Sequence, residues 1–136
     1  MRFIGLLKLK KRNKEAKMVG RITHDYIEIR QGDSFTILLQ FKDHHKFIDI
    51  NGSILKMFVK NKADGKIVLI KQGIIDDAAN GKAHISIAPD DTKKFNLKDN
   101  FATDIQITFA NGETHTIYPQ TIGKVASFIV SQDVTE

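Results

Sequence analysis

The histidines of this sequence are the first residues whose chemistry could define a site. The adjacent pair His44-His45 could supply two imidazole ligands to a metal ion. The pair stands in the turn-like stretch "KDHHK", and the sequence places no third ligand nearby. His24, His84 and His115 stand alone, which is typical of surface histidines. We therefore predict a solvated loop at residues 44–45 and no metal site.

Two pairs of adjacent carboxylates could support acid–base catalysis. Asp76-Asp77 lies in "IIDDAANGK", where Asp and Asn side chains favour a turn by bonding their own backbone. Asp90-Asp91 follows Pro89 and suits the start of a short helix, where carboxylates accept bonds from free N–H groups. None of the common nucleophile, phosphate-loop, dinucleotide or zinc-protease motifs occurs. We predict that the protein is not an enzyme and uses no cofactor.

The first 20 residues, "MRFIGLLKLKKRNKEAKMVG", form a basic segment ahead of a nearly neutral body. They carry seven Lys or Arg and one acid, whereas the remaining residues carry 14 basic and 15 acidic side chains. A nucleic-acid partner is not expected, because aromatic residues for base stacking do not alternate with the charges. A membrane-surface helix is not expected either, because apolar and charged residues separate along the chain and not around a helix.

Two interpretations of this arm, residues 1–21, remain: an anchor that binds another protein, and a terminal tail without a fixed structure. Exposed apolar residues without a partner are unfavourable, which favours the anchor. In this interpretation an apolar head is buried in the partner and a basic neck meets its acidic groups. The predicted partner-binding residues are Phe3, Ile4, Leu6, Leu7, Leu9, Lys10, Lys11 and Arg12.

Length and composition set the class of protein. A chain of 136 residues is enough for one ordinary domain. With no cysteine, disulfides and thiolate chemistry are excluded, which suits folding in a reducing cytoplasm. No apolar run approaches the ~20 residues of a membrane span. Most of the positive charges follow the apolar stretch of residues 3–9, whereas in a secretory signal they precede it. This order argues against a secretory signal.

Alternating apolar residues predict strands from residue 26 onward. Phe35, Ile37, Leu39 and Phe41 should share one face of a strand, with Leu38 as an exception on the other face. Further strands are predicted at 26–30, 54–60, 66–72, 83–88 and 124–131, with Ala83, Ile85 and Ile87 inside in the fourth of these and Ala126, Phe128 and Val130 on one side of the last. In "NFATDIQITFANGETHTIYP", Thr103, Ile105, Ile107 and Phe109 alternate with Asp104, Gln106 and Thr108 on the opposite face. A single helical turn is predicted in "PDDTKKFNL", ending near residue 97.

Two hairpin turns are predicted between these strands. Asp64-Gly65 marks one, and Asn111-Gly112 marks a two-residue type I′ turn. The second turn would place Phe109 opposite Thr114, Ile107 opposite Thr116 and Ile105 opposite Tyr118, with Pro119 ending the strand.

Seven or eight short strands with turns about every ten residues predict an all-β fold, an antiparallel immunoglobulin-like β-sandwich with one short helical turn and an N-terminal arm. The sandwich is expected to occupy residues 22–136 and the arm residues 1–21.

The order of these segments resembles a known family. "IEIRQGDSFTILLQFKD" gives a strand, a Gly-Asp turn and a long alternating strand, and "FIDINGSILKMFVKNKADGKIVL" gives a Gly turn, a strand and a charged hairpin. A short strand followed by a helical turn is indicated by "GIIDDAANGKAHISIAPDDTKKF". A closing hairpin followed by a final strand is indicated by "ATDIQITFANGETHTIYPQTIGKVASFIVSQDVT". The pattern resembles the immunoglobulin-like domains of tailed-phage structural proteins, in particular the N-terminal domain of baseplate upper proteins from phages of Gram-positive bacteria.

The resemblance implies a non-enzymatic virion protein, made in the host cytoplasm, that docks into a tail, baseplate or neck. Its partners would be other virion proteins in a homo- or hetero-oligomeric assembly, without nucleic acid or membrane. Two alternatives stay open. One is a cell-wall carbohydrate-binding module with Tyr26 or Tyr118 as a stacking surface. The other is a capsid decoration protein with the same sandwich.

Overall fold

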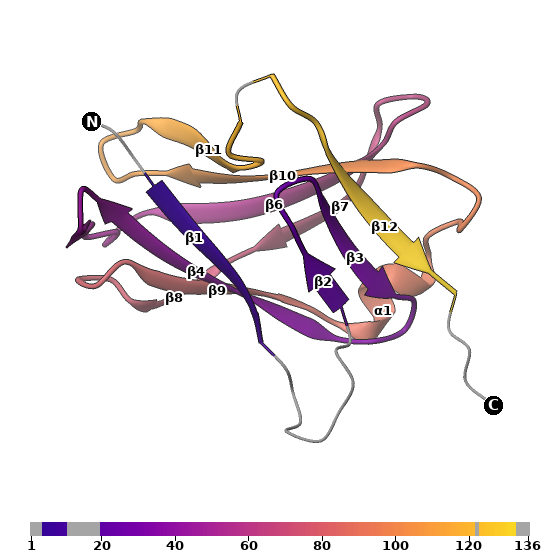
Figure 1. The fold of residues 1–136 in the computed structure, drawn as a ribbon, viewed down its shortest axis with the longest axis horizontal. Helices are drawn as coiled ribbons and strands as arrows, with labels where there is room; N and C mark the ends of the chain where they lie inside the picture. Colours follow the sequence, from indigo (N-terminus) through magenta and orange to yellow (C-terminus); the bar gives the residue numbers. More distant parts are fainter. Residues whose placement is uncertain (1–3, 11–19, 122, 133–136) are drawn as a thin grey trace.

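The computed structural model describes residues 4–10, 20–121 and 123–132, with the backbone alone for residues 4–10 and 20. These residues form twelve strands and one helical turn (Figure 1). The strands are β1 Ile4–Lys10, β2 Gly20–Ile22, β3 Tyr26–Arg30, β4 Phe35–Asp43, β5 Lys46–Phe47, β6 Ile54–Asn61, β7 Ile67–Gln72, β8 Ile74–Asp77, β9 Lys82–Ile87, β10 Phe101–Thr108, β11 Thr114–Tyr118 and β12 Ala126–Ser131; the helix is α1 Pro89–Lys93. None of the described residues belongs to a helix with the length and apolar character needed to cross a membrane.

The strands form two facing sheets. The first has the order β1-β4-β9-β8, with β5 on β4, and the second has the order β2-β3-β12-β10-β6-β7, with β11 on β10. The chain crosses between the sheets several times, and the last strand lies inside the second sheet, between β3 and β10 (Figure 1). This is the predicted immunoglobulin-like β-sandwich.

Two details of the fold prediction were wrong. The described residues contain twelve strands, not seven or eight, because β1, β2, β5 and β8 each pair with only one other strand and lack the long apolar alternation of the inner strands. The sandwich is also not wholly antiparallel, since β12 runs parallel to β3, with Phe128 opposite Ile27.

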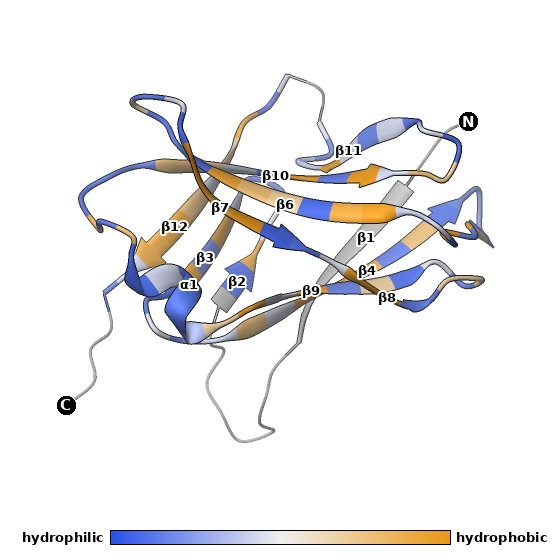
Figure 2. Cartoon of the chain, turned by 180° about the vertical axis from the view of Figure 1, so that it is seen from behind, coloured by the Kyte–Doolittle hydropathy of each residue, from blue (hydrophilic) through white to orange (hydrophobic). Residues whose placement is uncertain are grey.

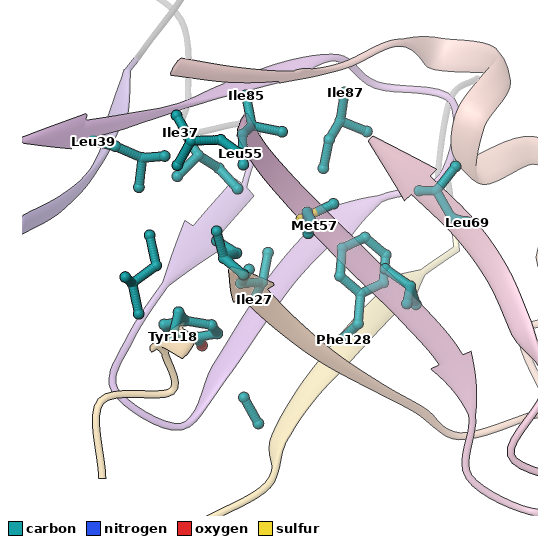
Figure 3. Packing of buried hydrophobic residues seen from close by; sticks show 14 of the residues in the cluster. Ile27, Ile37, Leu39, Leu55, Met57, Leu69, Ile85, Ile87, Tyr118 and Phe128 are labelled. Atoms are coloured by element: carbon teal, nitrogen blue, oxygen red, sulfur yellow. The ribbon is translucent and has the colours of Figure 1, made fainter. Parts of the chain in front are cut away.

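The core confirms the predicted alternation. The four predicted inward residues of β4, from Phe35 to Phe41, are 3% exposed or less. Side chains from the two sheets meet in one buried cluster, in which Ile37 and Ile85 come from the first sheet and Met57 and Phe128 from the second (Figure 3). Burial of such side chains is the main favourable term in folding.

The helical turn begins where it was predicted and ends earlier. Pro89 is its first residue, and the Asp91 carboxylate accepts a bond from the backbone N–H of Ala88 at 2.7 Å, which confirms the capping role. Asp91 also pairs with Lys71 of β7 at 3.0 Å. The helix ends at Lys93, and not near residue 97, after a single turn.

The hairpin between β10 and β11 has a longer loop than predicted. The N–H of Phe109 donates to the carbonyl of Glu113, and that of Gly112 donates to the carbonyl of Phe109. Only Gly112 takes a positive φ, of 92°, so the loop has three residues, as in a type I turn followed by a left-handed glycine. The register therefore shifts, and Ile107 lies opposite His115 and not Thr116.

A bulge in the same hairpin restores the remaining predicted pair. The register shifts again between Ile105 and Gln106, so that Ile105 lies opposite Tyr118 as predicted. β11 ends at Tyr118, directly before Pro119, which confirms that this proline ends the strand. The predicted turn at Asp64-Gly65 is also present, between β6 and β7, and Gly65 has a φ of 73°.

Gly81 is the glycine most tightly held by the fold. Its φ is +65°, and a Cβ atom there would lie 2.6 Å from the carbonyl oxygen of Phe41 and 2.8 Å from that of Ile48. Its own carbonyl accepts a bond from the N–H of Phe41 at 2.9 Å. The loop before β9 therefore packs directly onto the end of β4, with no space for a side chain.

We predict that Gly81→Ala destabilises the protein more than Gly112→Ala does. Both substitutions force alanine into a left-handed conformation, which costs about 1–2 kcal/mol. Only the first also meets backbone atoms, since a Cβ at Gly112 meets nothing within 4 Å. The added clash should cost about 1–3 kcal/mol more, measured by urea denaturation. Equal losses would show that the loop at Gly81 can move away from β4.

Candidate functional site

The candidate site is a groove on the outer face of the second sheet, where β10 changes its neighbour. Phe101 to Thr103 of β10 pair with β12, whereas Ile105 to Thr108 pair with β11. Asp104 lies between the two sets, and no described residue of β11 or β12 pairs with it. The connection from Tyr118 to β12 leaves the sheet at this point, which opens a groove of about 710 Å³ beside β10.

Three elements line the groove. Its floor is the outward face of β10, including Asp104 and Gln106, together with Thr116 of β11. One side is the β6–β7 hairpin, with Phe58, Lys60 and Ile67. The other side is the connection after β11, and its lining residues are Pro119, Gln120, Thr121, Gly123, Lys124 and Val125.

Asp104 is the most perturbed ionisable group in the groove. One carboxylate oxygen, Oδ1, is buried and has no hydrogen-bond partner among the described residues. Burial raises the pKa of this carboxyl above its usual range, and the positive charge of Lys60 acts in the opposite direction. A buried acceptor without a donor is costly, and such groups concentrate at functional sites.

An apolar row borders the groove on the side of β7. Ile70 of β7 lies opposite Phe58 of β6, and Phe58 lies opposite Asp104 of β10. Ile67 and Ile70 of β7, the edge strand beside β6, are 55% and 51% exposed. Figure 2, which views the molecule from behind, shows the hydrophobic colour on β6 and β7. We call Phe58, Ile67 and Ile70 the β6–β7 apolar row.

The structure places two segments of the predicted arm in strands of the two sheets. Residues 4–10 form β1, which pairs antiparallel with β4, so that Leu7 lies opposite Leu39 and Leu9 opposite Ile37. Residues 20–22 form β2, paired with β3. The division into an arm of residues 1–21 and a sandwich from residue 22 is therefore wrong for these two segments. The physical reason is the edge of β4, whose free N–H and C=O groups accept another strand.

The anchor prediction itself is not decided by this pairing. Phe3, Lys11 and Arg12 lie outside the described residues. For Ile4, Leu6, Leu7, Leu9 and Lys10 the backbone belongs to β1. Binding of a partner by these side chains stays a prediction.

The histidine and carboxylate pairs have mainly structural roles. His44 and His45 form the exposed turn between β4 and β5, as predicted, with φ values of 49° and 74°. His84 was predicted to stand alone, but its Nδ1 lies 2.7 Å from the Asp76 carboxylate of β8. Of the pair Asp76-Asp77, for which a turn was predicted, only Asp77 has this role. Its carboxylate accepts a bond from the Asn80 side chain at 2.8 Å. The described residues contain no group of three or more His, Cys, Asp or Glu able to hold a metal ion.

The predicted sugar-stacking residues are poorly placed. Tyr118 is 1% exposed and lies within the core, as Figure 3 shows. Burial, followed by the nearby charge of Asp25, raises the pKa of its hydroxyl above the usual range. Tyr26 is half-buried, and its hydroxyl accepts a bond from Arg21 at 3.3 Å. Tyr118 therefore offers no aromatic surface to a sugar.

Sequence reasoning placed Asp104 on the outward face of its strand but did not identify it as a site. The signal was present in two predicted features taken together. Ile105 was expected opposite Tyr118, and Pro119 was expected to end that strand. The residue of β10 before Ile105 must then lose its neighbour on this side, and that residue is Asp104.

Comparisons with known proteins do not identify a family for this chain. No protein-family model matches the chain, and no curated protein matches it. Among solved structures, one of murine CRIg aligns over 93% of this chain and 97% of its own, with a TM-score of 0.38 and 8% sequence identity.

We predict that Asp104→Asn raises the stability of the protein at pH 7. Because burial raises the folded-state pKa of this carboxyl, its ionised form destabilises the folded state relative to the unfolded state. The destabilisation is absent below the carboxyl pKa of the unfolded chain, about 3.9, and grows as the pH rises through the folded-state pKa. The urea midpoint should increase at pH 7, and the difference from the unmodified protein should disappear near pH 3.

Asp33→Asn is the matched control for this prediction, because it removes the same charge from the β3–β4 loop, away from the groove. It should not reproduce the pH-dependent gain. A lower urea midpoint for Asp104→Asn at pH 7 would show that the carboxylate makes favourable contacts in the folded protein.

We predict that deletion of residues 1–10 increases hydrogen exchange in β4. The amides of β4 that face β1 lose their partners, so their exchange should accelerate about tenfold or more. The amides of β10, which β1 does not pair with, serve as the control within the same sample. Unchanged exchange throughout β4 would mean that β1 is not held on the sheet and that the segment is free to act as an anchor.

Proposed function

We propose that this chain is a non-enzymatic structural protein of a tailed-phage virion, which docks into a tail, baseplate or neck assembly by protein–protein contacts. The observation that carries the docking role is the β6–β7 apolar row beside the groove, in which Ile67 and Ile70 are exposed and Phe58 is half-buried. A partner that covers this row removes apolar surface from water, which is the usual driving force for association.

The apolar side chains of the row lie next to one another, as in a docking face, and are not scattered singly over the surface. Phe58 and Ile70 are direct neighbours across the β6–β7 ladder, so one partner surface can cover both. Complete burial of an aliphatic side chain yields about 1.5–3 kcal/mol, and roughly half of each isoleucine is still exposed. Each should therefore contribute about 1 kcal/mol, with the polar groove residues setting the orientation of the partner.

The phage assignment is supported by the sequence resemblance described above, which implies an immunoglobulin-like β-sandwich, the class of fold that the two sheets form. In this proposal the partners are other virion proteins, and the location is the tail or baseplate after synthesis in the host cytoplasm. The capsid-decoration alternative uses the same docking face with a head protein as partner.

A second candidate function is binding of a cell-wall glycan. It is favoured by the polar floor of the groove, where Asp104, Gln106 and Thr116 offer hydrogen-bonding groups to sugar hydroxyls. Phe58 at the side of the groove supplies an aromatic ring in place of Tyr118.

We predict that Ile70→Glu prevents incorporation of the protein into virions. A carboxylate buried without a partner in an apolar contact costs several kcal/mol, so incorporation should fall at least about tenfold. The measurement is quantitative mass spectrometry of virions purified from cells that encode each variant. Thermal unfolding of the free protein should stay nearly unchanged, because the side chain is exposed.

Ile74→Glu is the matched control. Ile74 is 58% exposed, close to the exposure of Ile70, but it belongs to β8 of the first sheet. This variant should enter virions normally. Absence of the unmodified protein from purified virions would contradict the phage proposal, and normal incorporation of Ile70→Glu would contradict the choice of docking face.

A further inference from the structure

We infer that the groove on β10 receives an arginine side chain of the docking partner, with the Asp104 carboxylate as its counter-ion. This inference rests on the proposed docking function and specifies the chemistry of the partner. It begins from the position of Asp104, at the point where β10 has passed from β12 and has not yet reached its first pair with β11.

None of the described residues of the groove donates a hydrogen bond to one oxygen of this carboxylate. Asp104 Oδ1 has no hydrogen-bond partner in the part of the chain that the structure describes. A partly buried negative charge is satisfied best by a positively charged donor, because a neutral hydroxyl supplies a hydrogen bond but no opposite charge. This consideration favours a cationic ligand group over a sugar.

The groups around Asp104 fit an arginine side chain. Phe58, directly opposite on β6, presents an aromatic ring beside the carboxylate, and a planar guanidinium can lie on such a ring while it donates to an acid. Ile67 and Val125, which line the two sides of the groove, can contact the aliphatic part of the side chain. The volume of about 710 Å³ is more than one such side chain needs.

Two lysines line the same groove and must be considered. Lys124 pairs with Asp25 at 2.5 Å, so its charge is already compensated. Lys60 lies opposite Ala102, the next outward residue of β10, and its charge acts on Asp104 without forming an ion pair with it. Asp104 therefore keeps the capacity to bind a second, closer cation.

The test is a titration of the full-length, isotope-labelled protein followed by amide chemical shifts. The probe is N-acetyl-arginine N-methylamide, and its neutral isostere N-acetyl-citrulline N-methylamide is the matched comparison. We expect the arginine probe to shift the signals of Asp104, Gln106 and Thr116 saturably, with a dissociation constant on the order of 1–10 mM for a single side chain. The citrulline probe should bind at least about tenfold more weakly.

Variants and pH give independent readouts. Asp104→Asn should weaken arginine binding at least about tenfold, whereas Asp33→Asn should leave it unchanged. Binding should weaken as the pH falls and Asp104 becomes protonated, since only the ionised carboxylate attracts a cation. Equal binding of arginine and citrulline, or no arginine binding up to about 50 mM, would overturn the inference.

A parallel titration with diacetylchitobiose distinguishes glycan binding from arginine binding. Shifts of the same three signals with this sugar, without a response to arginine, would overturn the inference in favour of glycan binding. The outcome is also distinct from failure of the docking proposal. If Ile70→Glu is lost from virions while the unmodified protein binds no arginine and Asp104→Asn enters virions normally, docking stands and the arginine site is wrong.

Discussion

Ile37 and Ile85 of one sheet lie in the same buried cluster as Met57 and Phe128 of the other, and this contact between the sheets fixes the register of every inner strand. Side chains alternate between the two faces of a strand, so a shift of one residue would turn the apolar set outward. The same constraint determines which residues face outward. Asp104 faces the groove because Thr103 and Ile105 are held inside. Phe58 and Ile70 share one outer face because Val59 and Leu69 are both buried.

This dependence explains which features could be predicted from sequence. Inner strands bury one whole face, and their apolar alternation is visible in the sequence; the buried residues of β4, β9 and β12 were all identified in this way. The helical turn was found through its proline and aspartates. The residues that the structure places on the outward faces follow from the same alternation, which is why Asp104 was assigned to the correct side of β10.

Features that depend on backbone pairing alone were missed. β1 and β2 were assigned to an arm, because a strand at an edge needs only free N–H and C=O groups on its neighbour and no particular side-chain pattern. The hairpin loop was predicted one residue too short, since Asn-Gly suits both a two-residue turn and the end of a three-residue turn. The groove depends on the pairing of three strands at once, so no single stretch of sequence indicates it.

The parallel pairing of β12 with β3 has a consequence for the time at which this protein can fold. Ser127 to Ser131 pair with Tyr26 to Arg30, so an inner ladder of the second sheet joins segments about a hundred residues apart in the chain. Contacts of such long range form late and slow the folding of β proteins. During synthesis, a chain that still lacks β12 leaves β3 and β10 without the strand that lies between them. The sandwich, and the groove beside the β11–β12 connection, therefore become complete only after β12 has been made.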